Sequence, residues 1–371
     1  MYLSIPQLTS ALSIRDLTDP GQGPHAMQEL LDGVVSRLVQ TWNVPATVHR
    51  TTPLVATADN YDRLGYAHDD VTRDARYSRH ASPTVMLRSH TSAGVPAVLD
   101  SLTEIGNPYD RLHVLPGLVY RRDAVDRTHV GTPHQVDLWR LKARGLLGEA
   151  DLHSMAAAVV DAVLPGARWR AVPAAHSYTS HGLQIDVETS AGWLELAECG
   201  LVHARILRSA GLDPRRWSGL ALGMGLDRAL MLRKGVDDIR LLRSPDPRIA
   251  AQMLDLGPWR PVSLMPAVRR DLSILSTPEA DAEILGDVAR EALGKDADVL
   301  ESLVIRARTP VEQLPAAAVV RLEAQPGQVN LLVRLTLQAL DRTLTDGEAN
   351  RLRNRVYRAL HQGPVLELAA G

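Results

Sequence analysis

The chain has 371 residues and no phenylalanine, although it contains eight Tyr and six Trp; a soluble protein of this length would ordinarily carry on the order of a dozen. Apolar residues make up 45% and charged residues 23%, which is typical of folded proteins and excludes general disorder. The net charge of −2 excludes a histone-like affinity for polyanions, but it leaves room for a local basic patch.

The cysteine content and the hydropathy pattern indicate the cellular compartment of the protein. The only cysteine is Cys199, which excludes an intrachain disulfide and a zinc site built from cysteines. The first residues show neither the basic region nor the apolar core of a secretory signal. No apolar run approaches the roughly 18 residues of a membrane helix. We therefore expect a cytoplasmic protein without a membrane partner.

The first two thirds of the chain alternate between helical and strand patterns. An apolar pattern at i, i+3, i+4 and i+7 predicts an amphipathic helix over 24–42. The other expected elements, in chain order, are strands at 113–121 and 134–141, a helix at 149–163, strands at 183–189 and 192–197, a helix at 200–210, and a glycine-led strand end that continues as a helix over 219–235. This mixture favours an α+β fold.

Four glycine and proline residues between 255 and 266 indicate a domain break. We expect one domain over 1–257 and a second over 258–371. The elements expected after the break are a strand at 267–275, a helix at 279–293, strands at 299–307, 317–324 and 329–337, a helix at 345–361 and a strand at 364–368. Their core order, β-α-β-β-α-β, is that of a ferredoxin-like domain.

A glycine pattern and two histidine pairs could suggest a dinucleotide site or a metal site, but neither fits the known spacing. Gly223-Met224-Gly225 lacks the third glycine of a dinucleotide fingerprint, and no βαβ unit precedes it. The pairs His129 with His134 and His176 with His181 lack helical spacing and a third ligand. We predict no protein-built metal site.

Three segments carry groups suited to binding an anionic ligand. The hairpin expected over 120–137 ends one strand in Arg121-Arg122 and places Gln135 and Asp137 on the next, so cationic and carboxylate groups face one ligand. Segment 86–93 reads MLRSHTSA, which taken alone is compatible with an ordinary turn. Segment 219–228 feeds a glycine-rich strand into a helix that begins with an arginine, and glycines there also suit tight packing.

Taken together, these segments resemble the motifs of class II aminoacyl-tRNA synthetases, and specifically of phenylalanyl-tRNA synthetase. The likeness is strongest to the single-chain organellar form, in which the catalytic core is fused to a ferredoxin-like anticodon-binding domain. It extends over nearly the whole chain, because DDIRLL at 237–242, MPAVRRDLSIL at 265–275 and DRTLTDGEANRL at 341–352 also match in family order.

The resemblance implies an antiparallel-sheet catalytic core, ATP-dependent activation of an aromatic amino acid as an adenylate, and transfer to tRNA. It implies Mg²⁺ bridging the ATP phosphates and a monomer or a homodimer, the latter through helix 24–42. The implied catalytic residues are Arg121 and Arg228. The implied ATP-binding residues are Arg121, Asp123, Glu195 and Arg228. The implied amino-acid-binding residues are His90, Ser92, Gln135, Asp137, His176, Tyr178, Gln184, Glu198 and Cys199. The implied tRNA-binding residues are Arg269, Arg270, Arg351 and Arg355.

The amino-acid pocket departs from the family pattern. Asp137 stands where the family has a glutamate, and His176-Ser177-Tyr178 replaces a Phe-Pro-Phe run. Glu198 replaces a glycine, and Gln184 replaces an acid. Because buried polar groups need partners, we hypothesise a specificity shifted toward a polar or modified aromatic amino acid. The alternative is that His176 pairs with Glu198 and leaves a slot the size of a phenylalanine side chain.

Two other functions remain open at this point. The first is a stand-alone activating enzyme that passes its adenylate to a carrier or a small molecule. The second is a non-catalytic tRNA-binding regulator. Retention of the anticodon-type domain argues against the first, and retention of Arg121, Arg228 and Gln135 argues against the second. The missing phenylalanine suggests translation under a shortage of phenylalanyl-tRNA, with drift under codon bias as the alternative.

Overall fold

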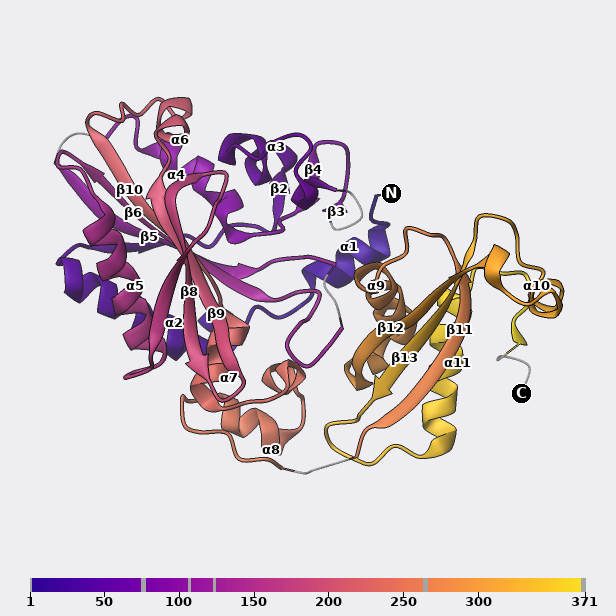
Figure 1. Cartoon of the computed structure of the whole chain (residues 1–371). Coiled ribbons are helices and arrows are strands. Elements are labelled where there is room, and N and C mark those ends of the chain that lie inside the picture. Colours follow the sequence, from indigo (N-terminus) through magenta and orange to yellow (C-terminus); the bar gives the residue numbers. More distant parts are fainter. Residues whose placement is uncertain (1, 75–77, 106–107, 123–124, 263–265, 368–371) are drawn as a thin grey trace. The chain divides into compact units, whose positions relative to one another are not determined.

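The computed structural model describes residues 2–74, 78–105, 108–122, 125–262 and 266–367. The chain divides into two compact units, which we describe separately (Figure 1). The described residues within Met1–Arg121, Thr132–Val236 and Gln252–Trp259 form the first, here called the core unit. Those within Arg122–Gly131, Asp237–Ala251 and Arg260–Gly371 form the second, here called the C-terminal unit.

A seven-stranded mixed sheet organises the core unit, in the order β1-β5-β6-β10-β9-β8-β7. Strand β1 runs parallel to β5, and the other neighbours are antiparallel. The strands are β1 (Ala46–Val48), β5 (Tyr109–Leu118), β6 (His134–Ala143), β7 (Trp169–Pro173), β8 (Thr179–Thr189), β9 (Gly192–Val202) and β10 (Trp217–Gly225). Long antiparallel strands satisfy their backbone groups in the ladder, so the central strands are almost fully paired.

Two long helices cover part of this sheet and contact each other (Figure 1). They are α2 (Ala26–Trp42) and α5 (Glu149–Val163), and they confirm the helices predicted over 24–42 and 149–163. The His25 ring accepts a hydrogen bond from the Met27 amide at the start of α2. At its end Asn43 adopts a left-handed conformation. The apolar stripe between these caps is buried, as the periodicity predicted.

The remaining elements of the core unit are short. They are α1 (Ile5–Leu12), β2 (Leu54–Ala56), α3 (Thr57–Asn60), β3 (Arg79–His80), β4 (Val85–Leu87), α4 (Val95–Ser101), α6 (Ala204–Ser209) and α7 (Leu226–Lys234). Strands β2, β4 and β3 make a small sheet of their own. The helix predicted over 200–210 begins only at residue 204, because β9 continues to Val202.

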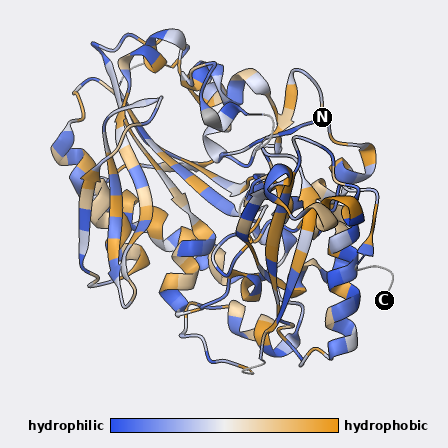
Figure 2. Ribbon diagram, turned by 45° about the vertical axis from the view of Figure 1, so that its right-hand side comes forward, coloured by the Kyte–Doolittle hydropathy of each residue, from blue (hydrophilic) through white to orange (hydrophobic). Residues whose placement is uncertain are grey.

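The C-terminal unit contains an antiparallel sheet in the order β11-β13-β12. Its strands are β11 (Val268–Ser276), β12 (Leu300–Pro310) and β13 (Val329–Leu337), and its helices are α8 (Pro247–Ala250), α9 (Ala282–Leu293), α10 (Ala316–Leu322) and α11 (Asp346–Leu360). Alternate residues of β13 are buried against α9 and α11. Figure 2 shows the matching alternation of hydrophobic and hydrophilic residues along the strands.

Two predicted strands of this unit are wrong. Segment 317–324 is mostly helix α10, because three successive alanines follow Pro315 and alanine has the highest helix propensity. The structure forms no strand within 361–367, the described part of the chain after α11. There the Gln362 amide donates a single hydrogen bond of 2.9 Å to the Leu275 carbonyl on β11. A ferredoxin-like order would need that last strand.

Two segments that we expected in the first domain group with the C-terminal unit. They are 122–131 and 237–251, and the expected division was 1–257 and 258–371. Arg127 Nε lies 2.9 Å from Glu301 Oε1. The Arg240 guanidinium donates to the carbonyls of Asp298 and Gln338 at 2.8 and 3.0 Å. None of the described helices has the length and apolarity needed to cross a membrane.

Candidate functional site

Three of the predicted amino-acid-binding residues lie on one row across four neighbouring strands. Asp137 on β6 is opposite Gly223 on β10, which is opposite Glu198 on β9, which is opposite Gln184 on β8. Residues directly opposite one another in a sheet face the same side. A Cβ atom placed on Gly223 would meet no atom within 4 Å. The row therefore carries polar side chains on either side of an open position.

Asp137 is held by hydroxyl groups from segment 86–93. Thr91 Oγ1 donates to Oδ2 at 2.7 Å, Ser92 Oγ donates to Oδ1 at 2.9 Å, and Trp139 Nε1 lies 3.3 Å from Oδ1. The carboxyl group is buried, and burial raises its pKa above the usual value, while these hydrogen bonds oppose the shift. Ser92 and Asp137, which the sequence analysis placed in one site, are therefore in direct contact.

Aromatic rings gather beside this carboxylate. His90 stacks on Tyr66 with ring centroids 5.4 Å apart, and Tyr178 stacks on Trp139 at 5.7 Å. Tyr66 and Tyr178 lie 6.4 Å apart. Burial, with the nearby charge of Arg121, lowers the pKa of His90 to about 3, so its ring is neutral at pH 7. These rings and Asp137 form one wall, partly apolar and partly acidic.

On the other side of Gly223, the row contains a contact between a histidine and a glutamate. His176 Nε2 lies 2.8 Å from Glu198 Oε2. The hydrogen bond from His176 holds the pKa of Glu198 below its usual value, with burial acting in the opposite direction. The pairing that we considered as an alternative is thus present. The Glu198 side chain nevertheless remains 41% exposed.

The predicted ATP-binding arginines lie shortly after the end of one element and at the start of another. Arg121 follows β5, and its Nε donates to the Ser89 carbonyl at 2.8 Å. Arg228 lies in the first turn of α7, with Nη1 3.3 Å from the Glu195 carbonyl and 4.0 Å from Glu195 Oε1. Burial raises the pKa of Glu195, and the neighbouring Glu198 adds to the shift. Asp123 lies outside the described residues.

Three further predicted residues occupy distinct positions. Gln135 is opposite both Gly117 and Gly225 on the face that carries Asp137. The Gln184 amide donates to Asp186 Oδ1 at 2.7 Å. Cys199 directly follows Glu198 in β9, so its side chain points to the other face of the sheet. Burial raises the pKa of this thiol to about 12. This placement does not support Cys199 as a direct contact of the pocket.

The four predicted tRNA-binding arginines differ in the contacts that their side chains make within the protein. Arg355 Nη2 donates to the Ala292 and Leu293 carbonyls at the end of α9. Arg270 binds Asp346 at 2.7 Å. Both are therefore anchored within the C-terminal unit. Arg269 and Arg351 are exposed.

Sequence reasoning missed several residues of the site. Tyr66 lies in a polar, turn-rich stretch without periodicity, so no local pattern identified it. Trp139 lies two residues after Asp137 on a strand, and the two-residue alternation of a strand indicates that both face the same side. Gly223 was set aside as a false fingerprint, although its open position is central to the site.

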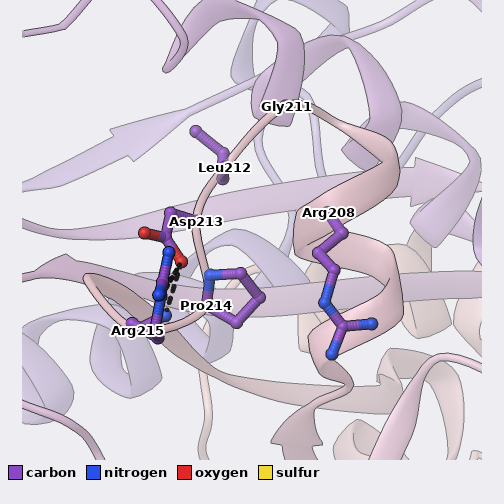
Figure 3. Close-up of a pocket in the computed structure, with 6 residues that line it drawn as sticks. All are labelled: Arg208, Gly211, Leu212, Asp213, Pro214 and Arg215. Atoms are coloured by element: carbon purple, nitrogen blue, oxygen red, sulfur yellow. Dashed lines mark hydrogen bonds and ion pairs between the residues drawn. The ribbon is translucent and has the colours of Figure 1, made fainter.

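A separate open hollow lies away from these residues (Figure 3). Arg208, Gly211, Leu212, Asp213, Pro214 and Arg215 line it. Arg215 Nε lies 3.2 Å from Asp213 Oδ1. None of the predicted site residues belongs to this hollow.

Comparison with known proteins identifies the family of most of the core unit. The family of tRNA synthetases class II core domain (F) matches residues 25–253. The chain belongs to this family.

Two individual proteins are similar in sequence to this chain. The chain is 36% identical over 193 residues to the phenylalanine–tRNA ligase alpha subunit of Prochlorococcus marinus (strain MIT 9313), covering 52% of this chain and 56% of that protein. It is 30% identical over 267 residues to the corresponding subunit of Chlorobium chlorochromatii (strain CaD3), covering 65% of this chain and 74% of that protein. The chain thus spans little more than half the length of the first relative. This degree of identity identifies the two subunits as homologues of the chain.

A likeness to solved structures is weaker. A pyrrolysyl-tRNA synthetase from Desulfitobacterium hafniense shares 18% identity, with a TM-score of 0.46 over 60% of this chain and 74% of that chain.

Proposed function

We propose that the protein activates an aromatic amino acid with ATP as an adenylate and transfers it to tRNA. The observation that carries this proposal is the convergence of Asp137, Glu198 and Gln135 on one sheet face of a class II core. The amino-acid carboxylate attacks the α-phosphorus of ATP and pyrophosphate leaves. The protein's contribution is to position two anions and to neutralise developing charge.

The arginines suit the nucleotide end of this reaction. Arg121 would bind the α-phosphate, and Arg228 would bind the outer phosphates, because guanidinium groups match phosphate oxygens in charge and geometry. Arg121 is fixed by the Ser89 carbonyl, which limits its freedom before ATP binds. Arg228 is only loosely held, at 3.3 Å from the Glu195 carbonyl.

The described residues include no cluster of three side chains suited to holding a metal. Mg²⁺ does not require such a cluster, because it usually binds through substrate phosphates and one or two carboxylates. Glu195 would supply the carboxylate. When bound, Mg²⁺ neutralises phosphate charge.

The C-terminal unit is proposed as an anticodon-binding domain of the single-chain type. Its strand order β11-β13-β12 supports a ferredoxin-like relationship, although the final strand is not formed in the described part. The exposed Arg269 and Arg351 are its proposed phosphate contacts. The proposed domains remain 1–257 and 258–371. Segments 122–131 and 237–251 belong to the first of these in sequence but group with the C-terminal unit in the structure.

The test is to incubate the full chain with ATP, pooled amino acids and total tRNA. We expect amino-acid-dependent exchange of pyrophosphate into ATP and aminoacylated tRNA. Exchange without acylated tRNA would favour a stand-alone activating enzyme instead. Neither reaction, with tRNA still bound, would favour a regulator and would contradict the proposal.

A further inference from the structure

The open position at Gly223 lies between two carboxylates. Asp137 and Glu198 occupy the strands on either side of β10, and both face the side on which Gly223 has no side chain. Adjacent strands are about 4.8 Å apart, so the two backbones are roughly 10 Å apart. A Cβ atom on Gly223 would meet nothing within 4 Å. The row therefore has an open position with a carboxylate acceptor on the strand at either side.

The two carboxylates differ in what remains available to a ligand. Asp137 accepts three hydrogen bonds, which leaves one of its roughly four acceptor positions. Glu198 accepts from His176 through Oε2, and its Oε1 makes no hydrogen bond within the described part of the chain. The lowered pKa of Glu198 keeps this carboxylate ionised at neutral pH. An ionised carboxylate accepts hydrogen bonds and donates none.

We propose that the amino acid recognised by this site has an aromatic side chain that ends in a hydrogen-bond donor, such as a phenol or an aromatic amine, and that Glu198 accepts that hydrogen bond. The inference rests on the proposed function and deepens it. The ligand's ammonium lies at Asp137, and its side chain crosses β10 above Gly223. His176 orients the Glu198 carboxylate by holding its other oxygen.

The spacing of the two strands indicates an approximate length for the ligand. If both carboxylates stand directly over their strands, two hydrogen bonds of about 2.8 Å within a separation of roughly 10 Å leave about 4 Å between the two donor atoms. Serine-sized side chains are too short for this. A side chain with an aromatic ring between the Cβ and the donor is long enough.

A plain benzyl side chain would fill the open position over Gly223 without satisfying Glu198. Leaving a partly desolvated acceptor unpaired typically costs about 1–3 kcal/mol, which corresponds to a preference of roughly 5- to 150-fold. Because Glu198 is 41% exposed, we expect the lower part of that range, about 10-fold. The pairing with His176 engages only Oε2, and the Glu198 side chain remains 41% exposed, so the pairing alone does not create an apolar slot.

The experiment compares pyrophosphate exchange by the full chain with phenylalanine, tyrosine and 4-aminophenylalanine. The wild type is expected to favour the two donor-bearing amino acids over phenylalanine by about 10-fold in kcat/KM. Glu198→Ala is expected to remove that preference. Glu188→Ala is the matched control, because Glu188 also contacts a basic side chain and is 40% exposed but lies outside the row.

Each outcome separates the two proposals. Equal or better exchange with phenylalanine in the wild type would overturn the donor inference while leaving amino-acid activation intact. No exchange with any amino acid by a folded chain would overturn both. Loss of the preference in the Glu188→Ala control would show that Glu198 is not its source. If Glu198→Ala fails to fold, the wild-type preference still decides the inference, and Glu198→Met replaces it as a variant of nearly equal size without a strong acceptor.

Discussion

Asp137 and Glu198 face the same side of the seven-stranded sheet, separated by the single strand that carries Gly223. Asp137 is buried and held by three donors, whereas Glu198 is partly exposed and held by one histidine. One end of the row is therefore rigid and the other adaptable. This asymmetry suits a site that fixes a constant group at one end and selects a variable group at the other.

Filling the open position at Gly223 is expected to block amino-acid binding without unfolding the protein. The Cβ atom of Gly223→Leu enters open space and the rest of its side chain is directed over the polar row, so we expect the melting temperature to stay within a few degrees of wild type. Amino-acid-dependent pyrophosphate exchange should fall at least about 10-fold, which corresponds to about 1.4 kcal/mol.

Gly219→Ala is the contrasting variant on the same strand. A Cβ there would lie 2.8 Å from Leu141 Cδ2 and from Val202 Cγ2. Overpacking of this kind typically costs about 1–3 kcal/mol. If a folded Gly223→Leu protein shows undiminished amino-acid-dependent pyrophosphate exchange, the amino acid binds elsewhere than over Gly223.

Removing the buried carboxylate is expected to destabilise the core unit. In Asp137→Ala, the donors Thr91, Ser92 and Trp139 lose their shared acceptor. An unsatisfied buried donor costs about 1–3 kcal/mol, and relaxation prevents full additivity, so we expect a loss of about 2–4 kcal/mol in the free energy of unfolding. Urea denaturation measures it. Gln135→Ala, on the same face, should change stability much less, and an equal loss in both variants would contradict this account.

Sequence patterns predicted the parts of the fold that depend on local periodicity. The apolar stripe of residues 24–42 matches α2 because a helix that covers a sheet must bury one face. The strand predicted at 317–324 failed because Val319 and Val320 look strand-like in isolation, while the preceding alanines and Pro315 favour a helix. In this short segment the valines favour a strand and the alanines favour a helix, and the helix forms.

The candidate site was predicted mainly through motif resemblance, and its contacts were not. Ser92 and Asp137 are 45 residues apart in the chain, and only the folded sheet brings them within hydrogen-bonding distance. Tyr66 comes from a loop with no distinguishing pattern, so its stacking on His90 was not predictable. The pairing of His176 with Glu198 was foreseen only as an alternative.

The arginines of α11 are expected to separate into binding and structural groups. Arg351 is exposed, so Arg351→Glu should weaken tRNA binding and lower its salt dependence, while stability stays within about 0.5 kcal/mol. Arg355 binds Asp296 at 2.5 Å and two carbonyls at the end of α9, so Arg355→Gln should lower stability by about 1–3 kcal/mol. Filter binding across a salt series and thermal melting measure the two effects. Unchanged tRNA binding by Arg351→Glu would move the nucleic-acid surface to another face.

The contact between His176 and Glu198 predicts a pH-dependent contribution of Glu198 to stability. Its pKa in the folded protein lies below the ordinary value of 4.5, first because His176 donates a hydrogen bond to it. The contribution is therefore fully present above the unfolded-state pKa and is lost as the pH falls through the folded-state pKa. Glu198→Gln should lower the free energy of unfolding by less than about 1 kcal/mol at neutral pH, because the side chain is well exposed. The difference from wild type should shrink below pH 4.5, and a difference that grows there would contradict the assignment.

Two arginine–aspartate pairs with identical spacing test how the C-terminal unit holds segment 237–251. Arg240 and Asp238 have side chains only 5% and 4% exposed, and Arg240 also donates to the Asp298 and Gln338 carbonyls. Arg240→Met leaves Asp238 buried without its partner, so we expect a loss of about 3–5 kcal/mol. Arg248 makes the same kind of pair with Asp246, but its side chain is 60% exposed, so Arg248→Met should cost less than about 1 kcal/mol. Denaturant unfolding of the two variants measures the contrast. Similar losses in both would show that the segment is not anchored through Arg240.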